Sequence, residues 1–134
     1  MVITRSKVPQ EQRVSHVSAI FSVRFLWFES FVFDVAGSLS SQYDGGYWEY
    51  FHLSNHGLYM APTGSSLYAV QCDNGFEGGM TQEAFGITAC LYAYSHLSFS
   101  ADAVFGGLCA DHYHRLRDFA LRHAEARDIL AATD

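Results

Sequence analysis

Histidines, cysteines and carboxylates are the groups from which a catalytic or metal site would be built, and this chain holds seven histidines and three cysteines. The histidines show no helical ligand spacing, because HExxH does not occur and the one HxxxH, His52 to His56, spans a predicted strand and turn. His112 and His114 stand two apart in a predicted helix, where side chains at that spacing diverge. The other five fall on different predicted elements: His16, His52, His56, His96 and His123. We therefore expect neither a metal site nor a cofactor.

Nucleophilic catalysis needs a serine or cysteine beside a histidine and an orienting acid. The chain has no GxSxG nucleophile elbow, and the adjacent Ser95 and His96 point in different directions on a predicted helix. The three cysteines are far apart, odd in number and form no CxxC, a pattern typical of buried thiols in a reducing cytoplasm: Cys72, Cys90 and Cys109. A cysteine–histidine pair that forms only in the folded chain stays open as an alternative.

Asp44 and Glu49 are the pair of carboxylates best placed for glycoside hydrolysis, since aromatic residues that could stack on a sugar surround them. Asp44 is more simply a turn residue before Gly45 and Gly46, and Glu49 more simply edges a strand. The glycine pairs match neither the P-loop nor the dinucleotide-binding fingerprint. We expect a protein that is not an enzyme, with a small hydrolase using Asp44 and Glu49 as the alternative.

The charge distribution argues against a phosphate-binding surface. The formal net charge is -6, from 14 acidic and 8 basic residues, and no lysine or arginine lies between Arg24 and Arg115. Direct DNA binding normally requires a basic face, because neutralising phosphates drives the affinity. A protein that imitates DNA would need dense carboxylate arrays, and 14 acids offset by 8 bases are few for that role. An acidic DNA-mimic inhibitor therefore remains an alternative only.

The order of helix and strand patterns along the chain predicts an α+β fold in a single domain, residues 1–134. Residues 1–13 are predicted to form a flexible lead-in. A helix is predicted over residues 25–36 and ends at Gly37. Three strands, residues 47–54, 58–62 and 66–73, are predicted to form an antiparallel meander, with a loop over residues 76–80. The turn Asn55-His56-Gly57 would place Gly57 in the left-handed conformation.

Two to three helices are predicted to complete the fold. Thr81 is a good N-cap for a helix over residues 82–97, whose nearly uniform apolar character predicts a central position in the core. Because Gly106 and Gly107 disfavour helix, the next one is predicted only from Leu108 to about His123, with a short helix over residues 125–132 after it. The apolar run over residues 17–36 is interrupted by charges, so we interpret it as core and expect no association with a membrane.

The predicted hairpin carries a specific resemblance. YDGGYWEYFHLSNHGLYMAP, residues 43–62, resembles the core motif of the KlcA/ArdB family of antirestriction proteins. Three further pieces are similar in the same order: FLWFESFVF (residues 25–33), YSHLSF (94–99) and the C-terminal residues 113–134. The resemblance implies a small α+β domain, encoded by plasmids or other mobile elements, that relieves cleavage by type I restriction–modification systems without being an enzyme.

No catalytic residue follows from the resemblance, so we expect inhibition through protein contact, direct or indirect. The partner would be the type I enzyme or a host factor that controls it, and the protein would act as a cytoplasmic monomer. The candidate contact residues lie in the loop, the hairpin and the last helices: Asp44, Gly45, Gly46, Glu49, Asn55, His56, Asp111, Asp118 and Asp128.

Overall fold

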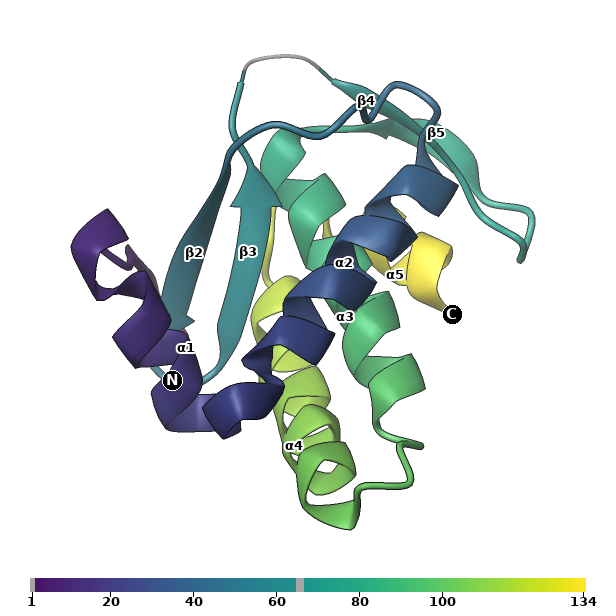
Figure 1. Cartoon of the computed structure of the whole chain (residues 1–134). Helices are drawn as coiled ribbons and strands as arrows, with labels where there is room; N and C mark the ends of the chain where they lie inside the picture. The colour runs from purple at the N-terminus through teal and green to yellow at the C-terminus, as the bar shows by residue number, and fades with distance from the viewer. Residues whose placement is uncertain (1, 65–66) are drawn as a thin grey trace.

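The computed structural model describes residues 2–64 and 67–134 and confirms the α+β class. Figure 1 shows a small sheet on one side of the molecule and a group of packed helices on the other. The helices are α1 (Arg13–Phe21), α2 (Phe25–Leu39), α3 (Gln82–Leu97), α4 (Ala103–Ala120) and α5 (Ala126–Thr133). The strands are β1 (Arg5–Lys7), β2 (Trp48–Leu53), β3 (Leu58–Pro62), β4 (Tyr68–Gln71) and β5 (Glu77–Met80).

The main sheet has three antiparallel strands in the order β1-β2-β3. Phe51 of β2 lies opposite Tyr59 of β3 and opposite Lys7 of β1. The edge strand β1 therefore lies within the segment that the sequence predicted to be a flexible lead-in, and the 3-10 helix η1 (Gln10–Gln12) follows it. All three residues of β1 are exposed, so the strand leaves no alternation of apolar and polar residues in the sequence.

The third strand of the predicted meander pairs differently. β4 forms a separate two-stranded antiparallel sheet with β5, in which Val70 lies opposite Gly78. The prediction that residues 66–73 pair with β3 was therefore wrong, and residue 66 lies outside the described residues. The loop predicted at residues 76–80 is also wrong, because Glu77–Met80 is strand β5. Two glycines in a four-residue strand remove the β-propensity by which such a strand is recognised.

Helix α2 continues through Gly37 and ends at Leu39, three residues after the predicted last residue, Ala36. The backbone N–H of Ser40 still donates to the carbonyl of Ala36, 3.2 Å away. Gly37 is exposed, so this glycine neither packs against another element nor takes the left-handed conformation that would end the helix. One face of α2 contributes buried side chains to the core: Phe28, Val32, Ala36 and Leu39.

Helix α3 runs through the middle of the core, as predicted, with ten consecutive or near-consecutive buried residues between Ala84 and Tyr94. Thr81 caps it, since its Oγ1 accepts a hydrogen bond from the backbone N–H of Ala84 at 3.3 Å. Strand β3 lies directly against α3 at Gly86, where an added Cβ would be 2.5 Å from the Cα of Ala61. Glycine at this position therefore sets how closely the sheet approaches the helix.

Helix α4 begins at Ala103, five residues before the predicted start. Asp102 caps it by accepting from the backbone N–H of Phe105 at 3.1 Å. Gly106 lies inside the helix, and this position has to be glycine because a Cβ there would be 2.9 Å from the carbonyl oxygen of Ser98. The glycine that disfavours helix locally is thus required by the packing of the preceding loop. Within the described residues, no helix combines the length and apolarity needed to span a membrane.

Candidate functional site

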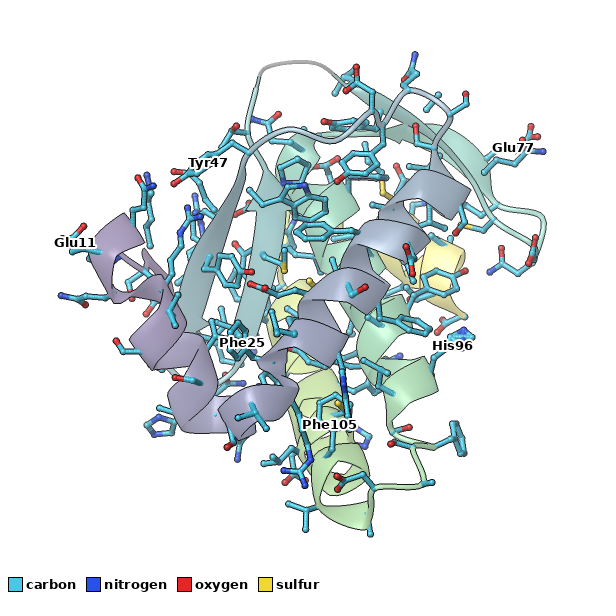
Figure 2. The ribbon with its side chains drawn as sticks, in the orientation of Figure 1. Glu11, Phe25, Tyr47, Glu77, His96 and Phe105 are labelled. Atoms are coloured by element: carbon cyan, nitrogen blue, oxygen red, sulfur yellow. The ribbon has the colours of Figure 1, made fainter. Side chains whose placement is uncertain are left out.

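The predicted contact residues do not share one surface. The loop with Asp44 precedes β2 and the turn with Asn55 follows it, so they lie at opposite ends of that strand (Figure 1). Figure 2 shows Tyr47 at the loop end. Asp111 and Asp118 are exposed on α4, and Asp128 is half-buried on α5.

The loop before β2 is exposed at Asp44, Gly45 and Gly46. Gly45 and Gly46 have φ angles of 98° and 105°, a region that other residues rarely adopt, so both glycines are required by the backbone. Glu49, three residues further on, is half-buried and forms an ion pair with Lys7 of β1. The backbone thus accounts for the glycines, and Asp44 is the free acidic side chain that the loop presents.

The hairpin turn is attached to helix α4. Asn55 Nδ2 donates to the carbonyl of Arg115 at 2.9 Å, and Asn55 Oδ1 accepts from the backbone N–H of Gly57 at 3.0 Å. The left-handed residue is His56, with a φ of 70°, so the prediction for Gly57 was wrong. Gly57 is needed for space instead, because a Cβ there would lie 3.1 Å from the Cβ of Arg115.

A cleft of about 260 Å³ lies beside the loop, between α1, α2 and β2; we call it the arginine cleft. Its centre is Arg13, whose Nη2 donates to the hydroxyl of Tyr47 at 2.5 Å. The guanidinium carbon of Arg13 also lies 4.5 Å from the ring centre of Tyr47 and 5.2 Å from that of Tyr50. The hydroxyl of Tyr50 donates to Glu29 of α2. Gly46 lines the same cleft and connects it to the predicted loop.

The arginine cleft has one unpaired donor, and the pKa of its carboxylate is shifted. The Nε atom of Arg13 is shielded from solvent and has no hydrogen-bond partner among the described residues. Burial raises the pKa of Glu29, and the neighbouring Arg13 offsets part of that rise. Glu29 is the only carboxylate among the described lining residues, so the cleft lacks the second acid that glycoside hydrolysis uses. Its chemistry suits recognition of a polar group.

Four residues of this cleft were not predicted as site residues from the sequence: Arg13, Glu29, Tyr47 and Tyr50. These side chains come from three elements that are adjacent only in the folded chain. The sequence did mark one of these residues, because Glu29 is an acid inside a strongly apolar helical segment. In the structure its side chain is half-buried. The remaining three follow ordinary helix and strand patterns.

A polar groove of about 700 Å³ runs between the main sheet and the starts of α3 and α5. At its centre, Glu83 accepts hydrogen bonds from the hydroxyl of Tyr59 at 2.6 Å and pairs with His123 at 2.8 Å and Arg5 at 2.9 Å. The bond to His123 is the main reason that the pKa of Glu83 lies below its usual value. Every acid that lines this groove has a polar partner, as Glu49 pairs with Lys7 and Glu125 accepts from Thr81.

The polar groove and the buried cysteines both argue against the hydrolase alternative. Asp44 is not among the residues that line the groove with Glu49, so these two acids do not share a site. All three cysteines are buried, and burial raises the pKa of the Cys90 and Cys109 thiols to about 12. A thiol with so high a pKa is a poor nucleophile at neutral pH. Asp44 and Glu49 therefore form no catalytic pair. Cys72 lines one pocket with Asp73 and His96, but it makes no hydrogen bond to His96 within the described residues, and burial raises the pKa of its thiol.

Histidines from separate elements meet in a third hollow. His16 of α1, His52 of β2, His56 of the turn and His112 of α4 line one cavity together with Arg115. The sequence did not predict this group, because the four histidines lie on four different elements that are adjacent only in the folded chain. No group of three or more histidine, cysteine or acidic side chains in the described part of the chain has an arrangement that could hold a metal ion.

Comparison with known proteins gives a consistent family. A family model described as "Antirestriction protein" matches residues 41–134. The chain is 36% identical to the antirestriction protein KlcA of Escherichia coli over 98% of its own length and 94% of the relative. It is 34% identical to the protein YafX of Escherichia coli K12, over 98% of this chain and 88% of that one.

The fold comparison agrees with the sequence comparisons. A solved structure of the KlcA and ArdB proteins superposes with a TM-score of 0.92 at 35% identity, over 100% of this chain and 96% of that one. The work on that structure describes a novel fold and antirestriction activity against type I DNA restriction systems in vivo but not in vitro. The family match, the identities and the shared fold lead to one conclusion: this chain belongs to the antirestriction protein family.

Proposed function

We propose that this chain relieves DNA cleavage by type I restriction–modification systems in cells, and that it does so by binding a protein and not by catalysis. One observation carries the proposal. The whole chain shares its fold, at a TM-score of 0.92 and 35% identity, with KlcA and ArdB proteins that have this activity in vivo. Identity and coverage this high support a common activity more strongly than fold alone would.

The partner is a type I enzyme in its cellular setting or a host factor that controls it. The activity described for KlcA and ArdB occurs in vivo but not in vitro, which favours a component that the cell supplies. The net charge of -6 and the stretch without basic residues from Arg24 to Arg115 argue against direct DNA binding. A non-enzymatic action is supported by the separation of Asp44 from Glu49 and by the burial that raises the pKa of all three thiols.

The acidic DNA-mimic alternative has less support. Such a protein needs free carboxylates in a stripe, but three of the acids here are neutralised by neighbouring cations: Glu49 by Lys7, Glu83 by Arg5 and Asp102 by Arg24. The exposed acids Asp44 and Asp111 lie on different elements, the loop before β2 and helix α4. We therefore favour contact through a shaped surface over imitation of DNA.

For the contact surface we favour the exposed loop with Asp44, Gly45 and Gly46 together with the arginine cleft beside it. The two glycines permit a loop conformation that few other residues adopt, and in that conformation Asp44 is exposed. Arg13 brings an incompletely bonded guanidinium to the same place. The second region, with Asn55, His56 and Asp111, meets at the junction of the hairpin and α4. We further propose that a mobile element encodes this chain and that the protein acts as a monomer in the cytoplasm.

The test is restriction relief in cells. The chain is expressed in a strain with an active type I system and in an otherwise identical strain that lacks it, and plaques from unmodified phage are counted. We expect more plaques only in the restricting strain. Asp44→Ala and Asp111→Ala then compare the two candidate regions, with the exposed Glu77→Ala as control. Unchanged plaque counts in the restricting strain, with the protein soluble and abundant, would contradict the proposal.

A further inference from the structure

A cavity of about 360 Å³ lies where α1, β2, the hairpin turn and α4 meet; we call it the histidine cavity. Four imidazoles and one guanidinium line it: His16, His52, His56, His112 and Arg115. The remaining wall is apolar and consists of Ala19, Ile20 and Leu108. The rings are close, with 5.1 Å between the centres of His16 and His52 and 6.0 Å between those of His52 and His56.

Three of these imidazoles have unused hydrogen-bonding capacity. His16 Nε2, His52 Nδ1 and His112 Nδ1 are shielded from solvent without a partner in the described chain. A shielded acceptor nitrogen costs less than a shielded N–H, so the favoured tautomer places the proton on the other ring nitrogen. These other nitrogens are not among the shielded atoms and make no hydrogen bond to the described residues, so each is left as a free donor.

Arg115 adds a positive charge to these donors. Its guanidinium forms no ion pair within residues 2–64 and 67–134, while its backbone carbonyl accepts from Asn55. The two neighbouring acids on the same helix, Asp111 and Asp118, are exposed and do not line the cavity. The cavity therefore offers N–H donors and one net positive charge but no carboxylate of its own.

We propose that the histidine cavity binds a carboxylate group carried on a short aliphatic chain. The carboxylate would accept from Arg115 and from the imidazole N–H groups of His52 and His112, while its aliphatic part would contact the wall at Ile20 and Leu108. A phosphate dianion fits less well, since only one fixed positive charge faces the cavity. A metal ion is disfavoured because the described ligands lack the arrangement to hold one. This site goes beyond the antirestriction activity and does not depend on it.

The charge state of the rings makes binding depend on pH. Burial lowers the pKa of His52, and the adjacent His16 and His56 lower it further. Burial also lowers the pKa of His112 to about 4, with Arg115 and His52 lowering it and Asp111 raising it. Burial thus favours the neutral form of both rings. A bound carboxylate stabilises the imidazolium form, so binding takes up protons and the affinity rises as the pH falls from 7 to 5.5.

The test uses NMR of the histidine ring protons in the intact protein. Sodium butyrate is titrated at pH 7 and pH 5.5, with sodium chloride at equal ionic strength as the blank. We expect saturable shifts of the His52 and His112 signals, tighter binding at pH 5.5, and no saturation with chloride. Arg115→Gln should weaken butyrate binding about tenfold, the value of one charge-assisted hydrogen bond. Arg122→Gln, which removes one exposed positive charge just after α4 and outside the cavity lining, should leave it unchanged.

Two further arms identify the source of the carboxylate and keep the proposal falsifiable. Tighter binding of butyrate than of N-acetyl-glutamate amide supports a free acid, and the reverse order supports a glutamate side chain of a partner protein. His52→Gln, checked for folding by circular dichroism, should weaken both ligands and remove the pH dependence at that ring. Failure of both carboxylates to saturate, or tighter binding of inorganic phosphate than of either, overturns the proposal.

Discussion

Asn55 and Arg115, 60 positions apart in the chain, are joined by a hydrogen bond of 2.9 Å from the Asn55 side-chain amide to the Arg115 backbone carbonyl. The other end of the same amide accepts from Gly57, so one side chain both shapes the turn and attaches it to α4. This attachment places His56 and His52 beside His112 and so helps to form the histidine cavity. A residue selected as a surface contact thus has a structural role as well.

Replacing Asn55 with alanine should destabilise the protein by about 1–3 kcal/mol, because it removes two hydrogen bonds at a half-buried position. Asn55→Asp keeps the acceptor for Gly57 but loses the donor to Arg115, so it should also destabilise. Urea denaturation followed by circular dichroism measures both. A loss below about 0.5 kcal/mol for both variants would show that the turn is held by its other contacts.

Gly86 and Gly37 form a matched pair of helical glycines. Gly86→Ala should destabilise the fold by more than about 3 kcal/mol, because the new Cβ would lie 2.5 Å from backbone atoms of Met60 and Ala61. Gly37→Ala, with no atom within 4 Å of the new Cβ, should stabilise α2 by about 0.5–1 kcal/mol. Thermal unfolding of the two variants checks the contrast, and equal effects would mean that β3 can move away from α3.

Local patterns predicted the elements that depend on local causes. The cap at Thr81 and the apolar α3 were confirmed, as were strands β2 and β3, because a capping hydroxyl and a buried aromatic strand mark the sequence directly. The misplaced elements depend on partners far away in the chain. Position 106 of the helix has no room for a side chain, because the carbonyl oxygen of Ser98 lies beside it. Gly78 belongs to a strand because it pairs with Val70.

The candidate sites also divide into those that local sequence predicts and those that depend on distant residues. The loop with Asp44 could be predicted from its turn residues, whereas the arginine cleft joins Arg13, Glu29 and Tyr47 from three elements. His16, His52 and His112 likewise share a cavity without any common spacing in sequence. Such groups become visible only when the topology is known, since the register of β2 and the position of α1 determine which side chains meet.

The cysteines should be inert in the folded protein. Burial raises the pKa of Cys72, and it raises those of Cys90 and Cys109 to about 12, so almost no thiolate is present at pH 7.5. Iodoacetamide should modify all three thiols in 6 M guanidinium chloride and none within the same time in buffer, as mass spectrometry would reveal. Rapid native alkylation of any one cysteine would restore the cysteine–histidine hydrolase as a serious alternative.

Glu83 should stabilise the protein only when ionised. Its folded pKa lies below the usual value of 4.5, so its contribution is present above about pH 4.5 and is lost as the pH falls through the folded pKa. Glu83→Gln should therefore cost about 1–2 kcal/mol at pH 7 and much less at pH 3. Urea denaturation of both proteins at the two pH values measures this, and a cost independent of pH would assign the effect to packing.

Glu29 should behave in the opposite way. Its pKa is raised by burial, so the ionised form is disfavoured in the fold above its unfolded pKa, and that cost disappears as the pH falls through the higher folded pKa. Glu29→Gln should raise the free energy of unfolding at pH 7 by up to about 1 kcal/mol, since an amide oxygen can still accept from Tyr50. The gain should vanish at pH 3, where Glu29 is protonated.

The same Glu29 variant separates stability from function. If the arginine cleft is the contact surface, Glu29→Gln removes the charge beside Arg13 and should reduce restriction relief in the plaque assay although the protein is more stable. Glu77→Gln, an exposed change on β5, should affect neither quantity. A stable Glu29→Gln protein with full activity would exclude the ionised carboxylate from the contact, and the loop at Asp44 would then be the region to map next.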